Sequence, residues 1–326
     1  MRQKVLCYGY YGANANNLGD SLFKVAFSRL FSDVDFTFTD TIRADEDLTV
    51  FSAFFFGAGS FLDGKINASD AAIDFVKNKP IFYLGVGGET NISWSHKRLM
   101  EQAKLIAIRN DDVGVLANKV ANKNIISIPD LVYSLQPDTI KTEQQNKILF
   151  IPNFLVVPKH NDPYWKISAW ERAKFSIAEA LDKICSEYVR VIDCFSMSTN
   201  PQANDANAMV EIANLMEFGH NIRYFTPTNF DDDMKLISSY KAVITQRYHG
   251  IILSELCKTQ HIVLSHHDKL KSHSPKQGEY VDYYAISKHK IVEAFETIWN
   301  NPRSIQSINL HSFDDLVGRV NQSLRE

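Results

Sequence analysis

The sequence lacks the features that would place the protein in a membrane or on nucleic acid. Its longest apolar run, Val50 to Gly59, is about half the length of a membrane span. The formal net charge is −3, which supplies no general basic field for nucleic acid. The N-terminal residues pass directly into an apolar strand and contain no h-region of a secretory signal. We therefore expect a cytoplasmic protein that binds no nucleic acid.

Cysteine is scarce, and its placement excludes a disulfide framework and a zinc site. The four cysteines form no CxxC pair, and most lie in apolar patterns typical of buried strands or helices. They are Cys7, Cys185, Cys194 and Cys257. The doublet of His266 and His267 resembles a ligand pair, but adjacent strand residues point to opposite faces, so one ion cannot easily bind both. We expect no metal site.

What the chain does have is a regular alternation of strand-like and helix-like segments over 326 residues, enough for two domains. This alternation is typical of parallel sheets with crossover helices. The polar, aperiodic segment 136–146 is expected to link two units. We predict an α/β fold with two Rossmann-like doubly wound domains facing a cleft. Their predicted ranges are residues 1–140 and 147–300, and residues 301–326 are expected to form a C-terminal helix that packs back.

The stretch from Lys241 to Leu256 carries the strongest functional signal. Its pattern predicts a buried strand that ends before QRYH, at 246–249, and a helix that begins at Gly250. Ligands bind at the carboxyl edge of an open α/β sheet. Arg247 supplies a permanent cation there, and His249 supplies a proton carrier near neutral pH. The start of the helix adds backbone N–H groups that suit an anion. A solvated arginine and a capping histidine fit the spacing equally well.

Two more cations end predicted strands. Lys269 ends the strand after Arg247, so in a parallel sheet it can lie at the same edge, although a solvated lysine in a basic loop is an equal alternative. Arg109 ends a strand of the first domain and can supply a second cation across a cleft. A salt bridge to Asp111 or Asp112 explains Arg109 equally well.

Glycine and polar residues end the other strands of the first domain. Two strands run into GAGS at 57–60 and GVGG at 85–88, and glycine allows close approach of a backbone or a ligand. The first strand turns through NLGD, at 17–20, into a helix expected from Asp20 to Phe31. Asp20 is a natural N-cap for this helix. The same geometry also presents Asn17 and Asp20 to the hydroxyls of a sugar.

Three further clusters have plainer explanations. The acids at 231–233 lie at the start of a predicted helix, where negative charges interact favourably with the helix dipole. Residues 270–278 are basic and rich in turn formers, and we expect a loop. The aromatic residues of 163–166 and 280–284 can flank the cleft and stack on sugars, but core packing explains any one of them.

Taken in order, these motifs resemble the polysaccharide pyruvyl transferase family. The matching segments are NLGD at 17–20, GAGS at 57–60, GVGG at 85–88, Arg109 after its strand, Pro129-Asp130, and the R-x-H of Arg247 and His249 followed by Lys269. The chain departs from the family pattern in a longer first turn, in Asn110 instead of aspartate, and in Gln260 where proline is common.

The resemblance implies a GT-B-like transferase of the cytoplasm, at the inner face of the membrane. The implied reaction moves pyruvate from phosphoenolpyruvate to two hydroxyls of a sugar as a cyclic ketal and releases phosphate, in surface polysaccharide biosynthesis. No cofactor or metal is implied beyond the donor substrate. The implied acceptor is a lipid-linked or nucleotide-linked sugar, with peripheral membrane contact through a lipid-linked acceptor.

The resemblance also assigns roles to residues. His249 is expected to be the general acid. The donor is expected to contact Arg247, Tyr248, Lys269 and Arg109, and the acceptor Asn17, Gly19, Asp20, Gly59, Gly87 and Gly88. Two other functions stay open at this point. One is a GT-B-like glycosyltransferase that uses a nucleotide-sugar donor, and the other is a non-catalytic carbohydrate-binding relative.

Overall fold

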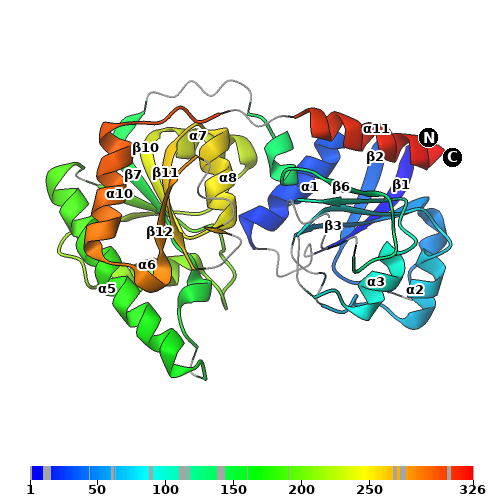
Figure 1. Ribbon diagram of the computed structural model, residues 1–326, viewed down its shortest axis with the longest axis horizontal. Coiled ribbons are helices and arrows are strands. Elements are labelled where there is room, and N and C mark those ends of the chain that lie inside the picture. Colours follow the sequence, from blue (N-terminus) through cyan, green and yellow to red (C-terminus); the bar gives the residue numbers. More distant parts are fainter. Residues whose placement is uncertain are drawn as a thin grey trace. The chain divides into compact units, whose positions relative to one another are not determined.

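The computed structural model describes residues 2–9, 16–43, 45–59, 62, 64–87, 91–109, 116, 118–137, 144–159, 161–189, 191–266, 270–271, 277–306 and 310–325. The chain forms two compact units (Figure 1). Unit 1 comprises Met1–Leu135 and Ile308–Glu326, and unit 2 comprises Gln136–Ser307. Among the described residues, each unit contains one six-stranded parallel sheet. The predicted two-domain α/β class is therefore confirmed.

The sheet of unit 1 has the strand order β2-β1-β3-β4-β5-β6, with all neighbours parallel. The strands are β1 (Gln3–Tyr8), β2 (Val34–Thr39), β3 (Ala53–Gly59), β4 (Ile81–Val86), β5 (Leu105–Ile108) and β6 (Ile125–Ser127). The chain leaves β1 toward β2 and returns to the other side of β1 with β3. This reversal places a topological switch point between β1 and β3.

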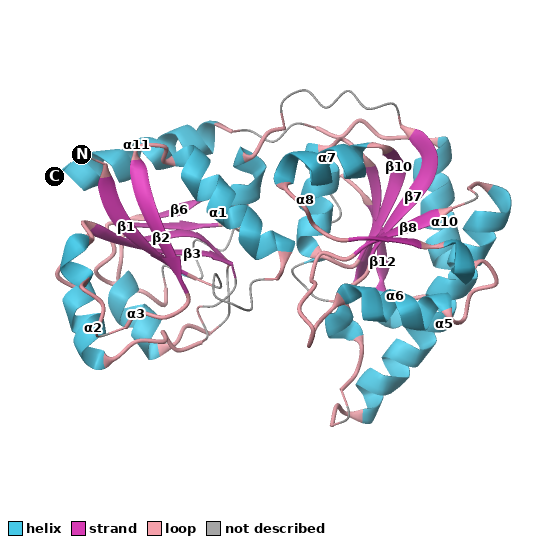
Figure 2. Ribbon diagram, turned by 180° about the vertical axis from the view of Figure 1, so that it is seen from behind, coloured by secondary structure: helices cyan, strands magenta, loops and turns pink. Residues whose placement is uncertain are grey.

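Helices cover both faces of this sheet (Figures 1 and 2). They are α1 (Leu18–Leu30), α2 (Asp70–Val76), α3 (Trp94–Met100) and α11 (His311–Arg325), with the short turns η1 (Leu48–Val50) and η2 (Leu131–Ser134). The helices α2 and α3 lie on one face, and α1 and α11 lie on the other. Phe27 of α1 and Phe31, its C-cap residue, pack against Phe55 of β3. The C-terminal helix belongs to unit 1, where Gln3 Nε2 donates to Leu324 O at 2.8 Å.

The first helix begins earlier than its sequence predicts. It starts at Leu18, and its N-cap is Asn17, whose Oδ1 accepts a hydrogen bond from Gly19 N at 3.0 Å. The prediction that Asp20 caps this helix was wrong, because Asn17 is itself a preferred cap residue and precedes it. Asp20 lies in the first turn, where its negative charge interacts favourably with the positive end of the helix dipole.

Glycine is required at the end of β3. Gly59 has φ 119°, a backbone conformation that residues with a side chain rarely adopt, and its carbonyl accepts from Gly87 N at 2.8 Å. Two of the four predicted acceptor-side glycines, Gly59 and Gly87, are thus joined at the carboxyl edge of unit 1. Gly88 lies outside the described residues.

The sheet of unit 2 has the order β12-β11-β10-β7-β8-β9, again parallel throughout. Its strands are β7 (Gln145–Ile151), β8 (Ile192–Phe195), β9 (Arg223–Phe225), β10 (Tyr240–Thr245), β11 (Gln260–Ser265) and β12 (Glu279–Asp282). The chain runs from β7 outward to β9 and then returns beside β7 with β10. The switch point of this sheet therefore lies between β7 and β10.

Two helical layers also sandwich this second sheet (Figures 1 and 2). One face is covered by α5 (Tyr164–Glu187), α6 (Asp205–Ala213) and α10 (Lys288–Asn300), and the other by α7 (Phe230–Ser238) and α8 (Tyr248–Leu256). The short turns are η3 (Phe154–Val156), η4 (Gly219–Asn221) and η6 (Tyr283–Ala285). Among the described helices, none is long and apolar enough to cross a bilayer.

Two features of unit 2 test the simpler sequence predictions. The acids 231–233 lie in the first turn of α7 as expected, although the cap itself is Asn229, whose Oδ1 accepts from Asp232 N at 3.0 Å. The edge strand β12 was not predicted. Its four residues follow a turn-rich segment and are only partly buried, so their pattern is too short to distinguish a strand from a loop.

Unit 1 contains a buried histidine that makes its stability depend on pH. His96 is 1% exposed, and its Nδ1 lies 3.0 Å from the hydroxyl of Tyr83. Burial penalises the charged imidazolium and lowers the pKa of His96 to about 4. The unfolded chain takes up this proton near pH 6.5, as model imidazoles do. Between these two values the unfolded state binds more protons, so stability falls as pH falls.

We predict that His96 alone removes about 2 kcal/mol from the free energy of unfolding between pH 7 and pH 5. The H96Q variant should lose that part of the pH dependence, measured as urea unfolding at both pH values. The H289Q variant is the matched control, because the side chain of His289 is 87% exposed. An equal pH dependence in H96Q and the wild type would contradict the assignment.

Candidate functional site

The carboxyl ends of β7 and β10 meet at the switch point of unit 2. Asn153 follows β7, and Gln246 and Arg247 follow β10. Asn153 N donates to Gln246 Oε1 at 3.0 Å, and Gln246 N donates to Ile151 O at 2.9 Å. These bonds tie the two strand ends together beyond the sheet. In doubly wound folds this is the position at which ligands bind.

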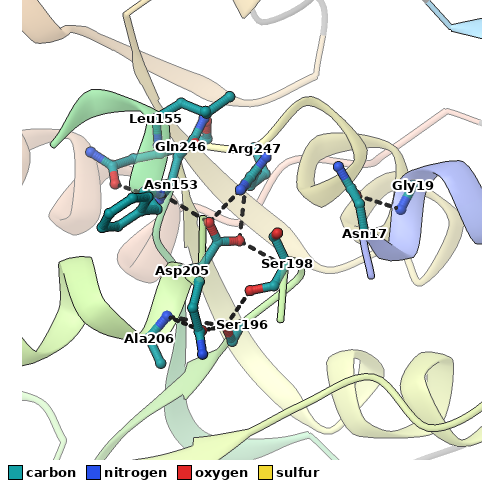
Figure 3. Close-up of polar contacts among 12 residues, drawn as sticks. Asn17, Gly19, Asn153, Leu155, Ser196, Ser198, Asp205, Ala206, Gln246 and Arg247 are labelled. Carbon is teal, nitrogen blue, oxygen red and sulfur yellow. Dashed lines mark hydrogen bonds and ion pairs between the residues drawn. The ribbon is translucent and has the colours of Figure 1, made fainter. Parts of the chain in front are cut away.

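Arg247 is held in a fixed orientation by Asp205 (Figure 3). Its Nε donates to Asp205 Oδ2 at 3.0 Å, and its Nη2 donates to Asp205 Oδ1. The Arg247 side chain is 12% exposed and that of Asp205 is fully buried. The two parallel N–H···O bonds make a fork-to-fork pair, which is stronger and more directional than a single bond.

The carboxylate of Asp205 is in turn held by the backbone. Oδ1 accepts from Phe154 N and Oδ2 from Ser198 N, each at 2.9 Å. Burial raises the pKa of the Asp205 carboxyl, and the charge of Arg247 opposes that rise. Four donors therefore converge on one buried carboxylate. Arg247 keeps the remaining N–H groups of its guanidinium, which can bind an anion at the outer edge of the fork.

The helix α8 starts one residue after this arginine. Arg247 is its N-cap, and Tyr248 and His249 form its first turn, so the predicted start at Gly250 was two residues late. The two aromatic residues are compatible with helix once tertiary packing favours it. His249 is half-buried, and its ring lies 5.5 Å from that of Tyr248. A cation, a histidine and the N-terminus of a nine-residue helix thus adjoin at one edge.

Close packing holds the start of α8 against β10. A Cβ added to Gly250 would lie 2.2 Å from Thr245 Oγ1, so no larger residue fits there without movement. Thr245 Oγ1 also accepts from Arg247 N at 3.0 Å. Glycine at position 250 therefore allows the contact that orients the backbone of Arg247.

A polar group extends this edge toward β11. Asn153 Nδ2 lies 3.3 Å from His266 Nε2 and 3.4 Å from Gln246 O. Because Asn153 Oδ1 accepts from Leu155 N at 2.9 Å, its Nδ2 is the donor, and His266 Nε2 must accept. His266 Nε2 is thereby committed to a hydrogen bond inside the protein. Among the described residues, no group of three or more His, Cys, Asp or Glu side chains is arranged to hold a metal ion.

The other predicted site residues lie in unit 1 or outside the described ranges. Arg109 is 5% exposed, and its Nη1 donates to Asp130 Oδ2 at 2.9 Å. Among the described residues its salt-bridge partner is Asp130, which also caps η2 by accepting from Val132 N at 3.0 Å. The predicted partners Asp111 and Asp112 lie outside the described residues. Lys269 belongs to a segment that the described residues do not include.

Unit 1 also contains the predicted acceptor-side residues. Asn17, Gly19 and Asp20 occupy the start of α1, and Gly59 and Gly87 end β3 and follow β4. These positions share the carboxyl edge of the unit 1 sheet.

Sequence reasoning missed three residues of the site, namely Asp205, Asn153 and Gln246. Asp205 lies 42 residues before Arg247 and looks like an ordinary acid in the first turn of a helix. Asn153 and Gln246 stand at the ends of predicted strands. A polar residue at the carboxyl end of a strand is itself a signal of a binding site. The side chain of Gln246 is fully buried, and its Nε2 has no hydrogen-bond partner among the described residues.

The two units and their switch points define a GT-B-like class of protein, and comparison with solved structures agrees. UDP-GlcNAc 2-epimerase from Methanocaldococcus jannaschii matches with a TM-score of 0.61 at 10% identity over 99% of this chain and 100% of the other. The Neisseria meningitidis 2-epimerase bound to UDP-GlcNAc matches with 0.58 at 13%, over 99% and 100%. Anabaena HepE in complex with UDP and glucose matches with 0.55 at 9%, over 98% and 100%. At such identity these likenesses show the fold alone.

The family itself is shown by sequence. The model of the polysaccharide pyruvyl transferase family matches residues 17–268, which is most of the chain and includes Arg247 and His249. The chain therefore belongs to this transferase family, and the resemblance stated above is confirmed. A search of curated protein sequences gives no significant match.

We predict that D205N lowers the free energy of unfolding by about 3 kcal/mol, because an amide leaves the buried Arg247 charge unbalanced. One amide N–H would also face a backbone N–H of Phe154 or Ser198. The comparison is D162N, because the partly exposed ion pair of Asp162 with Lys166 should contribute far less to stability. Denaturant unfolding measures both changes. Similar losses in the two variants would refute the central role of Asp205.

We also predict opposite signs for two Gly→Ala changes within helices. G250A should destabilise by about 1–3 kcal/mol, because its Cβ overlaps Thr245 Oγ1. G318A should stabilise by up to about 1 kcal/mol, because nothing lies within 4 Å of its added Cβ and alanine favours helix. Thermal unfolding of both variants checks the signs. A G250A protein as stable as G318A would contradict the packing argument.

Proposed function

We propose that this protein transfers pyruvate from phosphoenolpyruvate to two hydroxyls of a sugar, forming a cyclic ketal and releasing phosphate. One observation carries the proposal: Arg247 is oriented by Asp205 at the switch point of unit 2, directly before a helix whose first turn contains His249. Membership of the polysaccharide pyruvyl transferase family supports a carbohydrate acceptor.

Phosphoenolpyruvate is a small ligand with a carboxylate and a phosphate, so its recognition needs fixed cations and N–H donors. The outer edge of the Arg247 guanidinium can bind one anionic group in bidentate fashion. The N–H groups and dipole at the start of α8 favour the other. Tyr248 in the same turn supports the donor, and Lys269 and Arg109 are proposed as additional donor contacts.

The proposed reaction requires proton transfer to carbon. His249 as general acid protonates the methylene carbon of phosphoenolpyruvate, which becomes a methyl group. The first sugar hydroxyl attacks the neighbouring carbon, and its proton passes to the neutral imidazole of His249. Phosphate then leaves that carbon with its bridging oxygen. The second hydroxyl attacks the same carbon and loses its proton to the departing phosphate, which closes the ketal. Arg247 stabilises the charge that develops on the phosphate, and the scheme uses no metal or cofactor.

The remaining assignments belong to the same proposal. Asn17, Gly19, Asp20, Gly59, Gly87 and Gly88 are proposed to contact the acceptor. The acceptor is proposed to be a lipid-linked or nucleotide-linked sugar used in surface polysaccharide synthesis, and the protein to work at the inner face of the membrane. A lipid-linked acceptor would bring the protein to the membrane without a spanning helix.

The donor assignment predicts a ligand-dependent gain in stability. Phosphoenolpyruvate at a hundredfold excess over its Kd should stabilise the wild type by about 2.7 kcal/mol, measured as a thermal shift. R247K should lose most of this gain, because lysine lacks the bidentate fork. R223K is the matched control, because Arg223 makes the same forked pair with buried Asp193 but begins β9, at the opposite edge of the sheet.

The role of His249 is separable from binding. H249Q should keep the thermal shift with phosphoenolpyruvate and lose phosphate release in the presence of an acceptor. If phosphoenolpyruvate gives no shift and a UDP-hexose gives one that requires Arg247, the protein is instead a transferase with a nucleotide-sugar donor. Saturable sugar binding without phosphate release would indicate a non-catalytic binding protein.

A further inference from the structure

Two large aromatic side chains lie exposed and adjacent in unit 2. Trp165, in the first turn of α5, is 61% exposed, and Tyr284 of η6 is 49% exposed. Their ring centroids are 6.4 Å apart, and the ring planes are inclined by 54°. The residues come from segments more than a hundred positions apart in the sequence, so the fold, and not local sequence, brings them together.

The pair is held in place by polar contacts from its own surroundings. Arg172 Nη2 donates to Tyr284 O at 3.2 Å, and Tyr284 N donates to Asp282 Oδ1 at 2.9 Å. In the turn before α5, Asp162 Oδ2 accepts from Lys159 N and from Lys166 Nζ, each at 2.6 Å. These bonds fix the backbone segments that carry the two rings and do not use the ring faces.

A continuous series of contacts joins this aromatic pair to the Arg247 site. The Tyr284 hydroxyl donates to His266 O at 3.4 Å, and His266 Nε2 accepts from Asn153 Nδ2. Asn153 also donates to the carbonyl of Gln246, the residue before Arg247. The aromatic pair is therefore linked through His266 and Asn153 to the segment that precedes Arg247, at the carboxyl edge of the same sheet.

The chemistry of the pair fits a carbohydrate better than a lipid surface. Aromatic rings present apolar faces that can cover the C–H face of a sugar, and the Trp165 N–H can donate to one of its oxygen atoms. Anionic membranes attract clusters of Lys and Arg. Here the charges are balanced: described residues of 159–172 and 282–285 include three cations and three acids, Lys159, Lys166, Arg172, Asp162, Glu171 and Asp282.

We propose that Trp165 and Tyr284 form a binding platform for the sugar acceptor on unit 2. This inference rests on the proposed function, because the reaction requires a saccharide next to phosphoenolpyruvate. The two inclined rings suit two successive sugar units of an oligosaccharide, one stacked on each ring.

The test titrates the protein with methyl hexosides, their di- and trisaccharides and UDP-hexoses, followed by tryptophan fluorescence and by calorimetry. Wild type should bind at least one of these probes saturably. W165A and Y284A should each weaken that binding about tenfold, the equivalent of about 1.4 kcal/mol. Y284F should bind like the wild type, because it keeps the ring. W94A is the matched control, since Trp94 is 67% exposed but lies in unit 1 against Arg98.

The outcomes separate this proposal from the proposed function. If W165A keeps the thermal shift with phosphoenolpyruvate and loses sugar binding, the platform is supported. If phosphoenolpyruvate gives no shift in the wild type but sugar binding still requires Trp165, the platform stands and the donor assignment fails. Sugar binding that is unchanged in W165A and Y284A overturns the platform, and so does the absence of binding by any probe. Sedimentation with phosphatidylglycerol vesicles that requires Trp165, without sugar binding, would assign the surface to membranes instead.

Discussion

The ion pair of Arg247 with Asp205 is the interaction on which the candidate site depends. A buried carboxylate that accepts four hydrogen bonds is costly to desolvate and is tolerable only when every donor is in place. The donors come from η3, from the segment after β8 and from the segment after β10. A single pair therefore requires three strand ends to meet in one arrangement, and it orients the Arg247 guanidinium.

The fold explains why this pair lies where it does. Helices on both faces leave only the strand ends of a parallel sheet open to ligands. The strand order reverses between β7 and β10, so the connections that follow these two strands lead to helices on opposite faces and separate at this point of the edge. The UDP-GlcNAc 2-epimerases share this architecture at 10–13% identity. Since one fold supports several chemistries, the proposed reaction rests on Arg247, His249 and Asp205 and not on the architecture.

Sequence reasoning worked best where the signal was local. Buried parallel strands such as β4 and β10 are short apolar runs, and polar or glycine residues follow them, so their ends were readable within two residues. Helix starts were less readable. Asn17 and Asp20 are both good caps, and only the backbone geometry selects Asn17. At α8, the sequence predicts a turn of four polar or aromatic residues after the strand, whereas Tyr248 and His249 belong to the helix, which packs closely on β10 at Gly250.

By itself, the sequence determined the α/β class, the two doubly wound units, the family and the edge at which Arg247 and His249 stand, because each of these follows from short-range periodicity or from the order of motifs along the chain. Only the tertiary structure decided that Asp205 would orient Arg247, that Asp130 would neutralise Arg109, and that Trp165 would meet Tyr284. Each of these contacts joins residues at least 21 positions apart. No local pattern specifies such pairs, since their partners are selected by which strand ends the crossovers bring together.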